Sequence, residues 1–156
     1  MKYLLSIALL LGLLGSGLTS PAQARTIKFA TGGVSGVYYS LGKALADVIE
    51  MQTRHALAIK VLVTGASGEN LRLLSTDNVD LAIVQNDMAD AAFHGTMPFK
   101  HKHPQARAIA RLYPEYLHVV ASRASKVQTL QQFVGKKISI GARGSGNELN
   151  CRQLFS

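Results

Sequence analysis

The strongest constraint on the fold is a glycine-rich stretch, Phe29–Lys43. A short β-prone run enters it, and apolar residues at helical spacing follow from Val37. Between them, Gly32, Gly33 and Gly36 predict a tight turn with backbone conformations that a Cβ would forbid. A strand that feeds a helix through such a turn leaves unpaired N–H groups at the helix start, and these attract anions. The stretch therefore predicts a small-molecule site that accepts a carboxylate.

Two further strand-turn-helix units follow along the chain. Ala58–Thr64 is a β-branched run, and Ser67 stands where the N-cap of the next helix belongs. Val79–Val84 predicts the third strand, and a helix runs from Gln85 through Phe93. Near-continuous apolar strands that alternate with helices indicate an α/β fold, with a parallel sheet covered on both faces. In such sheets the ligand crevice lies outside the carboxyl ends of the strands.

The second half of the chain begins with a loop at residues 94–105, which contains Gly95, Pro98 and Pro104. Beyond it, the pattern predicts strands at Tyr116–Ser122 and Lys137–Ile140. A short helix between these strands is capped by Thr129, and a last helix starts at Asn147 after a second glycine-rich turn.

Neither histidines nor cysteine indicate a metal site or a disulfide. His94, His101 and His103 fall in the 94–105 loop, where no carboxylate or cysteine completes a coordination set, so solvated histidines are the preferred interpretation. The single cysteine, Cys151, excludes an intramolecular disulfide.

The N-terminus has the pattern of an export signal. Lys2 precedes the apolar run Leu4–Leu14, and Ala22–Ala24 gives a small-x-small cleavage site before Arg25. The alternative, a retained membrane anchor, is disfavoured because a bilayer span needs about 20 apolar residues. We expect a periplasmic protein that does not span the membrane after cleavage.

The charge balance does not by itself define a partner. The formal net charge is +8 and falls to +7 once Lys2 is removed with the signal segment. The basic residues are scattered, and no arginine stripe interleaves with stacking aromatics as a nucleic-acid groove requires. We therefore expect no nucleic-acid partner.

Enzyme motifs are absent or incomplete. Thr31 stands where a dinucleotide fingerprint needs its first glycine, and Ala44 replaces the Ser or Thr of a phosphate-binding loop. No Gly-x-Ser-x-Gly elbow and no paired carboxylates are found. We expect no catalysis, no cofactor and no metal.

The candidate ligand-binding residues lie at the predicted strand ends and helix starts. Several have a second interpretation: Tyr39 as a packed wall, Ser67 as only a cap, and Gln85 as a tie between two loops. Glu115 is interpreted as solvated or as a hinge residue. The candidates are Gly33, Ser35, Gly36, Tyr39, Thr64, Ser67, Gln85, Tyr113 and Ser145.

Four motifs in this order resemble the TAXI-type solute-binding subunits of TRAP transporters. The motifs are Thr-Gly-Gly-Val-Ser-Gly-Val-Tyr-Tyr (31–39), Glu-Asn-Leu-Arg-Leu-Leu (69–74), Asp-Leu-Ala-Ile-Val-Gln-Asn-Asp (80–87) and Leu-Tyr-Pro-Glu (112–115). The resemblance implies a type II periplasmic-binding-protein fold, with two hinged domains that close on a small carboxylated solute. Glutamate-like and 2-oxoglutarate-like solutes are the implied ligands, delivered to TRAP membrane subunits for uptake driven by an ion gradient.

The resemblance also sets the expected domain boundaries. Residues 1–24 form the signal peptide, 25–115 the first ligand-binding domain, and 116–156 the crossover and the start of a second domain. Members of that family are roughly double this length, so we expect a truncated second domain. Two alternatives to a transport subunit stay open: a periplasmic enzyme on a similar scaffold, and a remnant or exported antigen without a transport role.

Overall fold

A computed structural model describes residues 24–156. The predicted signal peptide therefore lies outside the described residues, except for Ala24. In chain order, the elements are β1 (Arg25–Ala30), α2 (Val37–Gln52), β2 (Leu57–Leu62), α3 (Ser67–Ser75), β3 (Leu81–Ala82), α4 (Asn86–His94), the short 3-10 helices η1 (Arg123–Ser125) and η2 (Leu130–Phe133), and α5 (Gly146–Leu154).

The three strands form a parallel sheet in the order β2-β1-β3. β1 pairs with β2 along its whole length, from Arg25 opposite Leu57 to Ala30 opposite Leu62. β3 pairs with β1 only at Phe29 and Ala30. The predicted α/β class with a parallel sheet is confirmed, although β3 is much shorter than the predicted run of residues 79–84.

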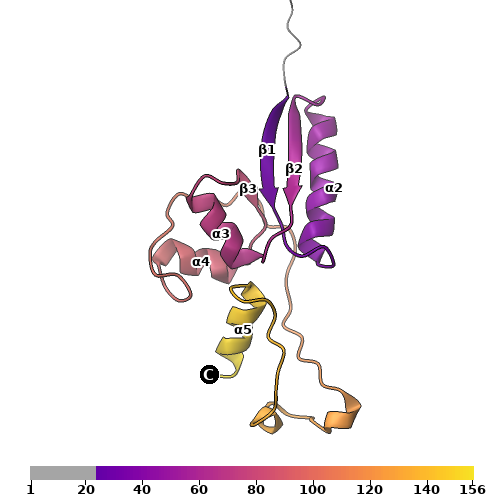
Figure 1. Cartoon of the computed structure of the whole chain (residues 1–156), viewed down its shortest axis with the longest axis vertical. Helices are drawn as coiled ribbons and strands as arrows, with labels where there is room; N and C mark the ends of the chain where they lie inside the picture. The colour runs from indigo at the N-terminus through magenta and orange to yellow at the C-terminus, as the bar shows by residue number, and fades with distance from the viewer. Residues whose placement is uncertain (1–23) are drawn as a thin grey trace, which may run out of the picture.

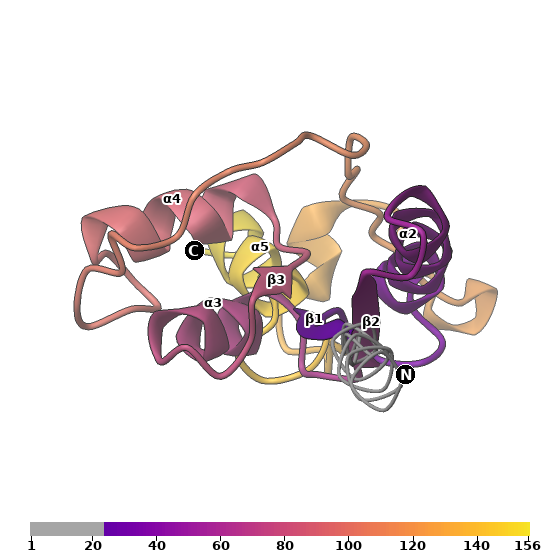
Figure 2. The same ribbon diagram turned by 90° about the horizontal axis from the view of Figure 1, so that it is seen from above.

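The helices lie at both sides of this sheet. α2 lies beside β2, whereas α3 and α4 lie together beyond β3 (Figure 2). A buried apolar cluster joins α3 and α4 and is built on Leu71, Met88 and Phe99. The guanidinium of Arg72 lies over the Phe99 ring, 5.5 Å from its centroid, which is a cation–π contact.

Asn70 ties the carboxyl ends of the three strands together. Its side chain is fully buried, and Nδ2 donates to the carbonyl oxygens of Thr31 (2.7 Å) and Ile83 (2.8 Å). Its Oδ1 accepts a hydrogen bond from the hydroxyl of Thr64 at 2.6 Å. Buried carbonyl groups need such partners, so one α3 side chain fixes the spacing of the turns after β1, β2 and β3.

Residues 106–145 cross below the sheet as an extended segment that carries η1 and η2 (Figure 1). The predicted strands at 116–122 and 137–140 are wrong for this structure. No strand lies alongside either run within residues 24–156, and Val120 is 87% exposed. A β-prone segment forms a strand only when an adjacent strand is available for backbone hydrogen bonding. The predicted helix after Thr129 is confirmed as η2, and Thr129 forms a capping box with Gln132.

Two predictions about the first unit also need correction. None of Gly32, Gly33 and Gly36 adopts a left-handed backbone conformation, since Gly36 has φ −91° and the other two are not among the glycines of positive φ. The helical spacing of apolar residues from Val37 predicts a buried face that includes Val37 and Val48, but these two side chains are exposed. The stripe of α2 that faces the sheet contains Gly42 and Ala46 instead. α2 covers the sheet with one narrow face, so apolar residues on its flanks stay in solvent.

Candidate functional site

A broad cleft lies at the carboxyl ends of the strands, and its lining joins the turns after the strands to α5. Figure 1 shows where these elements lie, with α5 below the arrowheads of β1 and β2. Its volume is about 1240 Å³, which exceeds the roughly 300–1,000 Å³ of a pocket for one drug-sized ligand. The walls come from the strand-to-helix turns, from residues 113–118 and 139–142, and from α5. A small solute in this open form would contact only part of the cleft.

Four helices begin at the edge of this cleft. The lining includes Gly36 and Tyr38 of α2, Ala66 and Ser67 of α3, Gln85 to Asp87 of α4, and Ser145 to Asn147 of α5. The first N–H groups of a helix have no intrahelical partner and carry roughly half a positive charge. The fold therefore directs four positive dipole ends into one space.

Most of the predicted site residues meet in this cleft. Tyr39 is not among the lining residues, and its neighbour Tyr38 lines the cleft instead. Tyr38, Gly42 and Ala46 are spaced four residues apart and share one face of α2. The predicted residues that line the cleft are Gly33, Ser35, Gly36, Thr64, Ser67, Gln85, Tyr113 and Ser145.

Three of the four candidate serine and threonine side chains already take part in hydrogen bonds through their hydroxyl groups. Thr64 donates to Asn70, Ser67 Oγ accepts from the Gln85 amide (3.0 Å), and Ser145 Oγ accepts from the Glu148 amide (3.2 Å). Ser35 has no hydrogen bond from its hydroxyl within residues 24–156. Thr64 uses its hydroxyl hydrogen on Asn70, whereas Ser67 and Ser145 act as acceptors and keep theirs. Contacts to an anion would therefore come from backbone amides and from the hydroxyls of Ser35, Ser67 and Ser145 more than from Thr64.

The predicted N-cap of α3 is wrong. Ala66 is the N-cap, and Ser67, the first helical residue, uses its hydroxyl to hold the turn after β3. Ala66 has φ 69° and ψ −150°, a backbone region that non-glycine residues rarely occupy. The cleft therefore holds one strained residue at the start of α3.

α5 is joined to the first turns of α3 and α4. Asn150 accepts a hydrogen bond from Gln85 Nε2 (2.9 Å) and donates to Asp87 Oδ2 (2.6 Å). A Cβ on Gly68 would overlap the carbonyl oxygen of Gly144. The backbone of α3 therefore packs directly against the backbone of the turn that precedes α5. Gln85 is thus a tie between two segments, which was the second interpretation of this residue.

A cluster of two phenols and one carboxylate lies on the other wall. Glu115 accepts hydrogen bonds from the hydroxyls of Tyr38 (3.1 Å) and Tyr113 (3.2 Å). Burial raises the pKa of Tyr113 to about 12, and the negative charge of Glu115 adds to this effect. Burial also raises the pKa of Tyr38 far above its usual range. Both phenols therefore remain protonated and donate to Glu115 throughout the physiological pH range.

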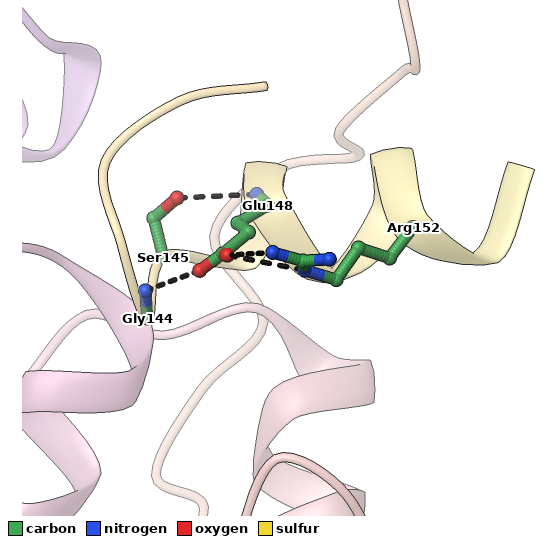
Figure 3. Close-up of polar contacts among 4 residues, drawn as sticks. All are labelled: Gly144, Ser145, Glu148 and Arg152. Carbon is green, nitrogen blue, oxygen red and sulfur yellow. Dashed lines mark hydrogen bonds and ion pairs between the residues drawn. The ribbon is translucent and has the colours of Figure 1, made fainter. Parts of the chain in front are cut away.

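The start of α5 is held by a compact set of polar contacts (Figure 3). Glu148 accepts from the Gly144 amide (2.5 Å) through one carboxylate oxygen and pairs with Arg152 (2.8 Å) through the other. The Gly144 hydrogen bond lowers the pKa of Glu148, and the hydrogen bond from Arg152 lowers it further.

We expect α5 to loosen from the cleft in acid. The lowered pKa of Glu148 means that its contribution to stability is complete above the unfolded value of 4.5 and is lost as the pH falls through the folded value. NMR shifts of the α5 amides, followed from neutral pH to about pH 3, measure this change. In Glu148→Gln the same amides should titrate much less, because the ionisable group is absent. Equal acid shifts in both proteins would contradict this assignment.

The described residues show no feature of a metal centre or a membrane span. Within residues 24–156, no three His, Cys, Asp or Glu side chains lie together as a metal site would require. No helix in this part of the chain is long and apolar enough to cross a bilayer.

A parallel sheet with helices at both sides and a cleft at its carboxyl ends defines an α/β domain of the periplasmic-binding-protein-like class. The chain belongs to the NMT1-like family, whose sequence model matches residues 29–156. Families of this class bind small solutes and are typically extracellular or periplasmic. The match supports a solute-binding protein, and it does not distinguish the TAXI type within that class.

Sequence reasoning missed several residues that build the site. Asn70, Asp87 and Asn150 act through contacts between distant segments, which no local pattern reveals. A signal for Tyr38 was present, since it lies four residues before Gly42 and eight before Ala46 on the face that packs against the sheet.

Proposed function

We propose that this protein is the periplasmic solute-binding subunit of a TAXI-type TRAP transporter. It captures a small carboxylated solute, of which glutamate and 2-oxoglutarate are the first to test, and delivers it to membrane subunits for ion-gradient-driven uptake. Membership of the NMT1-like family supports the solute-binding class. The four motifs between Thr31 and Glu115 support the transporter type.

The single observation that carries the binding proposal is the open start of α2. The other three helices that reach the cleft have an acid in the first turn, namely Glu69 in α3, Asp87 in α4 and Glu148 in α5. α2 has no acid there, and its N-cap, Gly36, has no side chain to cap the helix. A solute carboxylate would supply the missing negative charge at α2, where it is worth about 0.3–2 kcal/mol from the dipole alone.

The polar contacts favour binding without bond-making. A nucleophilic serine needs a base within hydrogen-bond reach. The hydroxyls of Ser67 and Ser145 accept from backbone amides, and among residues 24–156 no serine hydroxyl is hydrogen-bonded to a histidine. We therefore propose a protein that holds its solute and releases it unchanged.

Calorimetry on the purified full chain tests this function. Glutamate and 2-oxoglutarate are titrated first, followed by other small carboxylates. We expect a saturable heat with at least one of them, and an analogue whose α-carboxylate is replaced by an uncharged amide should bind much more weakly. The absence of a binding heat with every one of these carboxylated solutes would argue against a solute-binding role at this cleft.

A further inference from the structure

The charges that line the cleft do not suit a dianion. None of the lining residues is lysine or arginine, and His118 is the one lining side chain able to carry a positive charge. Two acids, Asp87 and Glu115, line the cleft. Three of the four helix starts already face their own acid, as described above. A solute with two carboxylates would therefore find one free helix start and, among the lining residues, no lysine or arginine for its second charge.

The two acids differ in what they can still bind. Asp87 is engaged on both oxygens, by the amide of Met88 (2.7 Å) and by Asn150 (2.6 Å). Glu115 is exposed, and within residues 24–156 its carboxylate accepts two hydrogen bonds, from the phenols of Tyr38 and Tyr113. A carboxylate offers about four acceptor positions, so Glu115 keeps capacity for a further donor.

Glu115 also lies close to the free start of α2. Tyr38 is the second residue of α2, and its hydroxyl reaches Glu115 at 3.1 Å. The Tyr38 side chain therefore spans the distance between two binding groups. At one end are the α2 amides, which would bind the carboxylate of the solute, and at the other is the Glu115 carboxylate, which would bind a cationic group of the solute. The two phenols hold Glu115 in place, because both remain protonated as described above.

Building on the proposed function, we propose that Glu115 is a specificity-determining residue that accepts the ammonium group of the solute. The solute class is then a zwitterion with one carboxylate at the start of α2, one cationic nitrogen at Glu115, and an uncharged remainder. An α-amino acid with a neutral side chain fits this class, and a dicarboxylate without nitrogen does not. A charge-assisted hydrogen bond to Glu115 provides the discrimination.

Three closely related solutes separate these features in calorimetry on the full chain. Glutamate and 2-oxoglutarate differ at the nitrogen, and glutamine and glutamate differ at the second carboxylate. We expect glutamine to bind most tightly and 2-oxoglutarate to bind at least about tenfold more weakly than glutamate. In Glu115→Gln the preference for glutamate over 2-oxoglutarate should fall to about threefold or less. Asp47→Asn, an exposed α2 acid outside the cleft lining, should keep the preference.

The outcomes separate the two proposals. Equal binding of glutamate and 2-oxoglutarate to the native chain, or an unchanged preference in Glu115→Gln, would overturn the role of Glu115 and leave the solute-binding function in place. No binding of any of the three solutes would count against the proposed function and overturn this inference with it. Because Glu115 is exposed, Glu115→Gln should unfold at the native temperature, which a thermal melt checks.

Discussion

Replacing Asn70 by alanine should lower the free energy of unfolding by about 3 kcal/mol or more. The change removes three hydrogen bonds and leaves the buried carbonyl group of Ile83 without the donor that Asn70 provides, while the Thr31 carbonyl keeps the 3.1 Å hydrogen bond from the Thr64 hydroxyl. Each unsatisfied buried polar group costs about 1–3 kcal/mol. The turns after all three strands should loosen together, since one side chain connects them.

Urea unfolding followed by circular dichroism measures the Asn70 effect. Asn78→Ala is the matched control, because Asn78 is exposed and its Nδ2 donates only to the nearby hydroxyl of Thr76. The control should change the free energy of unfolding by less than about 0.5 kcal/mol. Similar losses in both variants would show that Asn70 does not organise the strand ends.

Replacing Gly68 by alanine should detach α5 from the cleft and leave the α/β sheet intact. The new Cβ would overlap the carbonyl oxygen of Gly144, and a backbone group cannot turn aside as a side chain does. Such overpacking costs about 1–3 kcal/mol, which corresponds to a shift of about fivefold to more than a hundredfold away from the docked arrangement. α3 itself gains helix propensity from alanine, so the unfolding of the sheet should not become easier.

Hydrogen exchange of the α5 amides, compared with those of β1 and α2, measures the Gly68 effect. Protection of residues 147–154 should fall by about fivefold or more, while protection in β1 stays unchanged. Gly146→Ala provides a graded comparison, since its Cβ would overlap only the flexible side chain of Gln85. We expect a smaller loss there. Equal, small effects in both variants would mean that close backbone approach does not hold α5.

The sequence predicted the first α/β units well because their signals are local. The alternation of β-prone and helical patterns, with glycine and hydroxyl residues between them, placed β1, α2, β2, α3 and α4 close to their observed bounds. The position of the cleft followed from a topological rule about parallel strands. Eight of the nine candidate residues line that cleft for the same reason.

The sequence could not predict features that depend on contacts between segments far apart in the chain. The β-prone runs at 116–122 and 137–140 have strand composition, but a strand needs a partner, and the described residues provide none there. Whether Tyr38 or Tyr39 lines the cleft depends on how α2 is rotated about its axis against the sheet. Val37 and Val48 are apolar but exposed, so the hydrophobic pattern indicated the wrong face of the helix. The roles of Asn70 and Asn150 depend on contacts across 13 and 65 residues, respectively.

The central claim is that a solute carboxylate binds at the open start of α2, at the carboxyl edge of the sheet. NMR spectra of the backbone amides, recorded while a binding carboxylate is added to the full chain, test this claim most directly. We predict the largest shifts at Val37, Tyr38 and Tyr39, whose amides have no acid in the first turn of their helix. Shifts confined to residues outside the cleft, with these three amides unchanged at saturation, would contradict the claim.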